Sequence, residues 1–156
     1  MAASAVTGCS LCPPRNPGAE DRYEIARLSI STLYLYGDQR FRGYSVLAFD
    51  ARHAVSLAEL SSSEYTRYMD DLRSSVQAIT GALEPDHMNV EQMGNALPHL
   101  HWHIVPRYKD DPRWGKPIWV DWPPDDFNVN RLKLAEADAL QMTQRIRAEV
   151  ESAMRS

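Results

Sequence analysis

Cysteine is scarce in this sequence, whose 156 residues include two, Cys9 and Cys12. So few cysteines argue against the disulfide framework of a small secreted domain, and a C-x-x-C pair is typical of a metal site or of ordinary thiols. Long apolar runs are also missing: no stretch approaches the roughly 20 residues of a membrane-spanning helix. The first residues contain neither a basic segment nor an apolar core, so we expect no secretion signal, no membrane association and a cytoplasmic location.

An excess of positive charge is absent as well. The chain has 17 Lys and Arg against 21 Asp and Glu, a net charge of −4, which argues against general binding to nucleic acid. The composition, 44% hydrophobic and 24% charged, is ordinary for a globular protein. Because the sequence shows no repeat, low-complexity segment or linker, we expect residues 1–156 to form one domain.

The hydrophobic patterns predict both strands and helices. A dense run of β-branched and aromatic residues over 23–36 predicts a strand, and a turn at 37–40 leads to a second strand over 43–49. A capping-box pattern at 61–64 opens a long helix that ends near 81–83, before Pro85. A short strand over 88–93, a turn at 94–95, a strand through 98–107 and a C-terminal helix over about 130–153 follow. This order predicts an α+β domain, an antiparallel sheet with one long helix packed on it and a C-terminal helix.

Two segments do not fit a regular element. Residues 1–20 hold the cysteine pair and three prolines and predict an irregular lead-in. Residues 108–127 hold a cluster of aromatic residues and prolines: Tyr108, Pro112, Trp114, Pro117, Trp119, Trp122, Pro123 and Pro124. Long irregular stretches in a compact domain are usually functional, so we expect this Trp/Pro-rich loop to lie near a binding cleft or on a partner.

Three histidines alternate with apolar residues in the strand through 98–107. On a β-strand alternate side chains share one face, about 6.5–7 Å apart, so His99, His101 and His103 are expected to stand in a row that one phosphate chain can contact. The residues between them, expected to face the core, are Leu100, Trp102 and Ile104. Two other interpretations are three ordinary histidines and three ligands of one metal ion.

The stretch from Gly94 to Arg107 resembles the signature of the histidine triad (HIT) superfamily. The similarity covers about residues 9 to 110 and includes the cysteine pair, Gly43-Tyr44, Arg52-His53, the long helix and the histidine strand. The chain looks closest to bacterial proteins of the diadenosine-polyphosphate-hydrolase-like kind and is more distantly similar to galactose-1-phosphate uridylyltransferase. The resemblance implies a HIT-like sheet, a homodimer, and a nucleotide cleft over the histidines where a bond at the α-phosphate of a nucleoside phosphate derivative is broken.

The resemblance also assigns roles to residues. It places the nucleophile at His101, which suits a neutral imidazole with a free nitrogen pair, and puts His103 beside the phosphate oxygens or the leaving group. A covalent nucleotidyl-His101 intermediate then passes to water in a hydrolase or to a second phosphate compound in a nucleotidyltransferase or phosphorylase. The residues expected to contact the substrate are Asn89, Asn95, Asp38 and Arg107.

Two positions depart from the family pattern. Ala96 stands where many relatives have Ser or Thr, and Tyr44 stands where many have His. Both departures concern the leaving group and therefore the substrate, and they keep open a different class of function, a non-catalytic nucleotide-binding scaffold.

The same resemblance implies that the cysteine pair binds a metal ion. In zinc-containing members an N-terminal Cys pair joins a central His and the first histidine of the triad, which here are Cys9, Cys12, His53 and His99. Four such ligands suit a closed, structural zinc site. Two alternatives remain at this point: ordinary thiols with a surface His53, or a catalytic zinc held by all three triad histidines.

Overall fold

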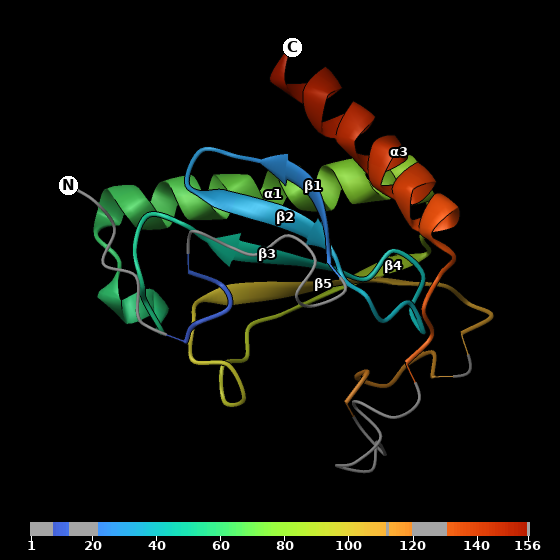
Figure 1. The fold of residues 1–156 in the computed structure, drawn as a ribbon, viewed down its shortest axis with the longest axis horizontal. Helices are drawn as coiled ribbons and strands as arrows, with labels where there is room; N and C mark the ends of the chain where they lie inside the picture. Colours follow the sequence, from blue (N-terminus) through green and yellow to red (C-terminus); the bar gives the residue numbers. More distant parts are fainter. Residues whose placement is uncertain (1–7, 13–21, 112, 120–130, 156) are drawn as a thin grey trace.

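The computed structural model describes residues 8–12, 22–111, 113–119 and 131–155. Its elements in chain order are β1 (Tyr23–Arg27), β2 (Ser31–Leu35), β3 (Ser45–Phe49), the 3-10 helix η1 (Leu57–Glu59), α1 (Ser62–Leu83), β4 (His87–Glu91), β5 (His101–Arg107) and α3 (Glu136–Met154). The five described strands form one antiparallel sheet in the order β1-β2-β3-β5-β4 (Figure 1). The long helix α1 lies along one face of the sheet, and α3 packs against α1 and β1. The predicted α+β architecture is confirmed.

The strand predicted within 23–36 is two strands, β1 and β2, joined by a tight turn. Leu28 N donates to Ser31 O at 2.8 Å across that turn. The carboxylate of Asp71, on α1, accepts hydrogen bonds from Ser29 N, Ile30 N and Ser31 Oγ at 3.1, 3.0 and 2.6 Å. The turn between β1 and β2 is therefore stabilised by a buried carboxylate from a helix 40 residues away in sequence. The local sequence pattern over 23–36 does not predict this contact.

Helix α1 begins and ends where its signals predict. The Ser61 side chain accepts from Glu64 N at 3.2 Å, and the Glu64 carboxylate accepts from Ser61 N at 2.8 Å, which completes the capping box. Hydrogen bonds from Arg52 and Ser61 lower the pKa of Glu64 to about 2. At the other end Glu84 adopts a left-handed conformation with φ of 49°, and Pro85 follows.

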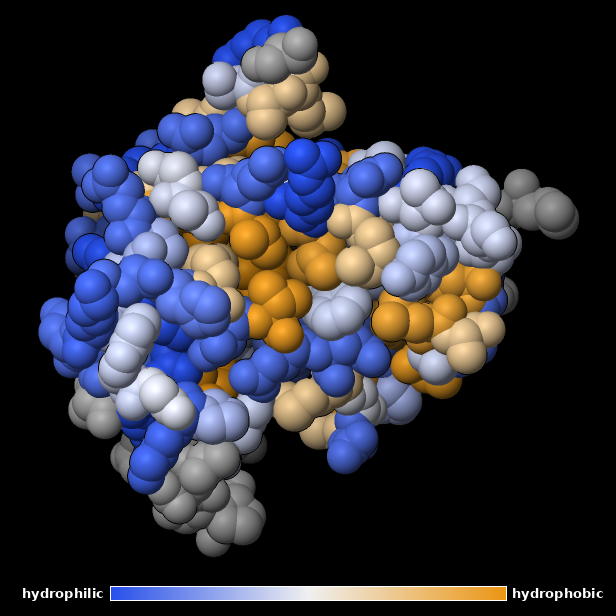
Figure 2. Space-filling view, turned by 180° about the vertical axis from the view of Figure 1, so that it is seen from behind, coloured by the Kyte–Doolittle hydropathy of each residue, from blue (hydrophilic) through white to orange (hydrophobic). Residues whose placement is uncertain are grey.

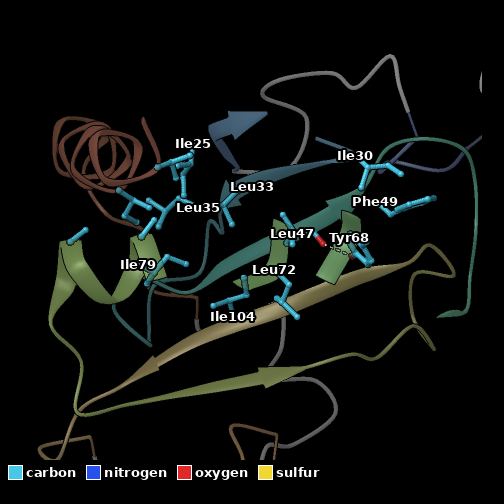
Figure 3. Packing of buried hydrophobic residues seen from close by; sticks show 14 of the residues in the cluster. Ile25, Ile30, Leu33, Leu35, Leu47, Phe49, Tyr68, Leu72, Ile79 and Ile104 are labelled. Atoms are coloured by element: carbon cyan, nitrogen blue, oxygen red, sulfur yellow. Dashed lines mark hydrogen bonds between the residues drawn. The ribbon is translucent and has the colours of Figure 1, made fainter. Parts of the chain in front are cut away.

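The two faces of the sheet carry different residues, as Figure 3 shows for the core face. The side chains of Leu33, Leu35, Leu47 and Ile104 meet those of Tyr68, Leu72 and Ile79 from α1 in the main core. Tyr68 also donates its buried hydroxyl to Leu47 O at 3.0 Å. Because side chains alternate along a strand, the neighbours of these residues point to the opposite face. There His101 lies beside Ala48 and His103 beside Val46.

Several expected boundaries are wrong by a few residues. Strand β5 begins at His101, so His99 lies just before it, and β4 ends at Glu91 rather than 93. Helix α3 begins at Glu136 rather than 130, and a residue of the preceding segment instead pairs with the turn after β2: Gln39 N donates to Leu132 O at 2.8 Å. Parts of the lead-in and of the Trp/Pro-rich loop, including Trp122, lie outside the described residues. None of the described helices has the length and apolar content that a membrane crossing requires.

Candidate functional site

His101 lies at the start of β5 with its ring fixed by the backbone. Its Nδ1 lies 2.6 Å from His99 O, and because a carbonyl oxygen only accepts, Nδ1 carries the proton. The neutral ring then has an unshared pair on Nε2. Burial is the main cause that lowers the pKa of His101 below its ordinary value, so the ring is held in the neutral form that a nucleophile requires.

His103 stands next to His101 on the same face of the sheet. The two Nε2 atoms lie 3.1 Å apart, and His103 Nδ1 lies 2.6 Å from the Tyr44 hydroxyl. Burial, followed by the neighbouring His101, lowers the pKa of His103 to about 3. The structure thus brings the two predicted catalytic histidines into direct contact.

The indole of Trp119, in the Trp/Pro-rich loop, packs edge-on against the ring of His103. Its ring centre lies 5.3 Å from that of His103 in an edge arrangement, and its N–H donates to the carboxylate of Glu91. Glu91 pairs with His103 across β4 and β5. Neither contact was predicted from the sequence. Glu91 follows Asn89 by two residues, so both share one strand face, and this spacing could have placed Glu91 in the site.

The cysteine pair, His53 and His99 form a compact cluster. One ligand atom from each residue lies within 4.8 Å of all the others. His53 Nδ1 lies 3.3 Å from Cys12 Sγ, and His99 Nδ1 lies 3.4 Å from Cys9 Sγ and 3.7 Å from Cys12 Sγ. The other ring nitrogen of His99 donates to Phe49 O at 2.8 Å, and Nδ1 faces the sulfurs.

Two predicted substrate residues, Asn89 and Arg107, contact each other. The Arg107 side chain is 3% exposed and donates to Asn89 Oδ1 and Asp111 Oδ2, both at 2.7 Å. It also donates to the backbone oxygens of Arg113 and Lys116 at 2.6 and 2.8 Å. Arg107 therefore anchors the described part of the Trp/Pro-rich loop, and a direct role in binding phosphate stays a prediction.

The other two predicted substrate residues lie in different surroundings. Asp38 is 3% exposed, and its carboxylate accepts from the Arg40 guanidinium at 2.5 Å and from Leu132 N at 3.2 Å. Asn95 is exposed in the segment between β4 and β5. A contact of either residue with a substrate stays a prediction.

A cleft of about 330 Å³ opens between β4 and the Trp/Pro-rich loop. Asn89, Glu91, Arg107, Trp114 and Lys116 are among the residues that line it. Trp114 is 43% exposed. The cleft therefore lies beside the histidine pair and combines an exposed indole with a cationic side chain.

The chain is similar in sequence or in fold to several known proteins. Residues 44–110 match the sequence model of the HIT domain. The match contains Tyr44, His53 and all three histidines of the row, while the cysteine pair and α3 lie outside it. No curated protein matches the sequence.

Solved structures share the fold of this chain along most of its length. A histidine triad protein from Bradyrhizobium japonicum is 21% identical, with a TM-score of 0.73 over 83% of this chain and 91% of that one. A histidine triad protein from Marinobacter aquaeolei is 20% identical, with a TM-score of 0.72 over 85% and 90%. A zinc-bound histidine triad family protein from Mycobacterium smegmatis is 19% identical, with a TM-score of 0.59 over 87% and 89%. At these identities the likeness establishes a shared fold.

Proposed function

We propose that this protein is a nucleotide-phosphate hydrolase or nucleotidyltransferase that works through His101. The observation that carries the proposal is the fixed orientation of His101, whose Nδ1 donates to His99 O at 2.6 Å and whose Nε2 faces His103. A neutral, oriented imidazole with a second imidazole beside its free nitrogen is the arrangement that covalent catalysis at phosphorus needs.

The reaction has two displacements. The lone pair of His101 Nε2 forms a bond to the α-phosphorus while the bond to the leaving group breaks, and the leaving group takes that electron pair. An acceptor oxygen then attacks the same phosphorus, and the N–P bond breaks with its pair returning to Nε2. Water as the acceptor, which loses a proton to solvent, gives a hydrolase; a phosphate compound gives a transferase or phosphorylase.

The function is tested with a panel of substrates. Diadenosine polyphosphates and a fluorogenic adenosine phosphoramidate, each incubated with and without inorganic phosphate, are followed by chromatography of the nucleotide products. A nucleoside monophosphate in both conditions indicates a hydrolase, and a nucleoside diphosphate that forms only with phosphate indicates a phosphorylase. Binding of these compounds without any turnover would contradict the proposal and favour a nucleotide-binding scaffold.

The Trp/Pro-rich loop is proposed to hold the nucleotide. Trp119 contacts His103, and Trp114 lines the adjoining cleft; indoles stack on bases with about 1–3 kcal/mol each. The Trp114→Ala, Trp119→Ala double variant is expected to raise the Kd for nucleotide about tenfold or more in calorimetric titration. Tyr65→Ala, which removes an exposed aromatic from α1, is the matched control, and an unchanged Kd in the double variant would exclude the loop from binding.

The Cys/His cluster is proposed to bind one structural zinc ion through Cys9, Cys12, His53 and His99. The residues fit this ion, because zinc bonds of about 2.3 Å to sulfur and 2.0–2.1 Å to nitrogen in a tetrahedron separate neighbouring donors by roughly 3.3–3.8 Å. Three of the six donor separations are 3.3, 3.4 and 3.7 Å and fall in that range, and all four donors lie within 4.8 Å of one another. The hydrogen bond from His99 to Phe49 O supplies the outer contact that orients a ligating imidazole. The reduced thiols suit the cytoplasm, the location that we propose.

Self-association is the remaining part of the proposal. Strand β4 is an edge of the sheet, with one row of backbone groups unpaired within the described chain. Beside it lie partly buried or exposed apolar side chains on the helix-bearing side, among them Met69, Val76, Met88, Val90 and Trp102. Figure 2 shows an apolar area in the middle of this side. We expect light scattering at micromolar concentration to give the mass of a homodimer, and a monomer mass would refute this prediction.

A further inference from the structure

Tyr44 contacts His103 from the side opposite His101. Its hydroxyl oxygen lies 2.6 Å from His103 Nδ1, and the residue is 2% exposed. Gly43 precedes it with φ of 85°, a conformation that L side chains rarely adopt, and makes the turn that leads Tyr44 toward β3. The ring of Tyr36 packs against that of Tyr44 with centroids 4.8 Å apart. The hydroxyl is therefore held in place beside the ring nitrogen.

Tyr44, His103 and His101 form a line of hydrogen bonds that ends at the carbonyl oxygen of His99. The proton positions along this line follow from that carbonyl. His101 Nδ1 donates to His99 O, so a neutral His101 has a bare Nε2. His103 Nε2 must then be the donor across the 3.1 Å contact. Since the neutral ring carries one proton, His103 Nδ1 is bare and accepts from the Tyr44 hydroxyl. All three hydrogen bonds thus run in one direction, from Tyr44 toward the backbone of His99.

The neighbours of His103 that the structure describes keep it neutral. Burial lowers its pKa to about 3, and burial raises the pKa of Tyr44 well above its ordinary value. Trp119 directs its N–H to Glu91 rather than to the imidazole. The neutral ring of His103 therefore has a single proton, on Nε2, and its loss would leave an imidazolate anion. Tyr44, whose own pKa is raised, does not readily replace that proton.

We propose that Tyr44 is a positioning residue that fixes His103 as a neutral Nε2–H donor, and that the site therefore takes substrates whose leaving group departs as a weakly basic anion. A phosphate or polyphosphate leaving group belongs to this class, and an alkylamine or alkoxide does not. The inference rests on the proposed function and narrows its substrate class.

The chemistry of bond cleavage gives the reason. When a P–O bond to a phosphate breaks, the electron pair stays on an oxygen that is stable as an anion, and the His103 N–H has only to donate a hydrogen bond to the phosphoryl oxygens. When a P–N bond to an amine breaks, the nitrogen must receive a proton during departure. His103 can provide that proton only by becoming an imidazolate anion, and Tyr44 can restore it only by becoming a buried phenolate.

The first test determines the tautomer of His103 in the free protein. Long-range proton–nitrogen correlation spectra of the full-length zinc-loaded protein with 15N-labelled histidine report which ring nitrogen is protonated, and His103→Gln identifies the signal. We expect the Nε2–H tautomer near neutral pH in the wild type and a shift toward Nδ1–H in Tyr44→Phe. An Nδ1–H tautomer or an imidazolium in the wild type would overturn the proposal.

The second test varies only the leaving group. Adenosine 5′-monophosphate esters of substituted phenols share one nucleotide and one ring size but differ in the pKa of the departing phenol. From the most to the least acidic phenol, kcat/KM is expected to fall about 100-fold or more, because none of the described groups around His103 supplies the 10²- to 10⁴-fold contribution of general acid catalysis. A rate that depends little on the phenol would show that a proton donor operates and would overturn the proposal.

Tyr44→Phe connects the two tests. Loss of the fixed donor at the phosphoryl oxygens is expected to lower kcat about tenfold to 100-fold and to leave KM within about threefold. Tyr68→Phe, which removes another buried, hydrogen-bonded hydroxyl on the opposite face of the sheet, is the matched control for loss of stability and should keep kcat. An unchanged kcat together with an unchanged tautomer in Tyr44→Phe would refute the positioning role. Absence of turnover with every ester would instead refute the proposed function, since the tautomer is measured without turnover.

Discussion

His101→Ala is expected to lower turnover of the best nucleotide substrate by about three orders of magnitude or more. The substitution removes the atom that bonds to phosphorus, so both displacements are lost rather than slowed. Steady-state kinetics measure the loss. Intact-mass analysis of acid-free quenched reactions should show a nucleotidyl adduct on the wild-type protein and none on the variant. His103→Ala, which keeps the nucleophile but loses the neighbouring donor, should accumulate the adduct for longer.

Two controls separate this loss from damage to the fold. The variant should keep its zinc and its melting temperature within a few degrees, because the His101 ring nitrogens contact the backbone oxygen of His99 and the ring of His103, and none of the ligand atoms of the Cys/His cluster. Turnover by His101→Ala close to that of the wild type, with no adduct on either protein, would end the proposal of a covalent mechanism.

Cys12→Ala is expected to lose zinc and to unfold at a much lower temperature. The Cys12 sulfur is within 3.7 Å of donor atoms from both His53 and His99, so its removal breaks the closed ligand set. Metal binding to a structural site is folding free energy. A loss of several kcal/mol in a domain of this size lowers Tm by about 10 °C or more, at roughly 2–4 °C per kcal/mol. Elemental analysis and thermal unfolding measure the two effects.

Ser10→Ala is the matched control, since Ser10 lies between the two cysteines and only its backbone oxygen has a described contact, with Arg22. We expect about one zinc per chain in the wild type and in Ser10→Ala. Zinc that survives Cys12→Ala but disappears in His101→Ala would show that the histidine row itself is the metal site, and the proposed mechanism would be wrong.

The sequence was most informative where the signal is local or repetitive. The capping box at Ser61 and the stop at Pro85 set the limits of α1, and the alternation of histidines with apolar residues set the faces of β5. The grouping of Cys9, Cys12, His53 and His99 came from resemblance to a family, and the structure brings these residues together.

What the sequence did not show depends on contacts between distant residues. The turn between β1 and β2 depends on Asp71, and the late start of α3 depends on backbone contacts with the segment around Gln39. Arg107 was expected near phosphate, but whether a strand-end arginine faces a ligand or binds a loop depends on where that loop returns. Tyr44 was regarded as the loss of an imidazole, and only the 2.6 Å contact with His103 shows what the hydroxyl contributes.

His99 takes part both in the Cys/His cluster and in the orientation of His101. Its ring faces the cysteines, while its backbone oxygen accepts a hydrogen bond from the Nδ1–H of His101. The contact between Cys9 and His99 spans 90 residues, and β1, β2, β3, α1 and β4 all lie between the two residues in the chain. The carbonyl that orients the proposed nucleophile therefore belongs to a residue that is also a proposed zinc ligand, so we expect a change at the Cys/His cluster to alter the orientation of His101.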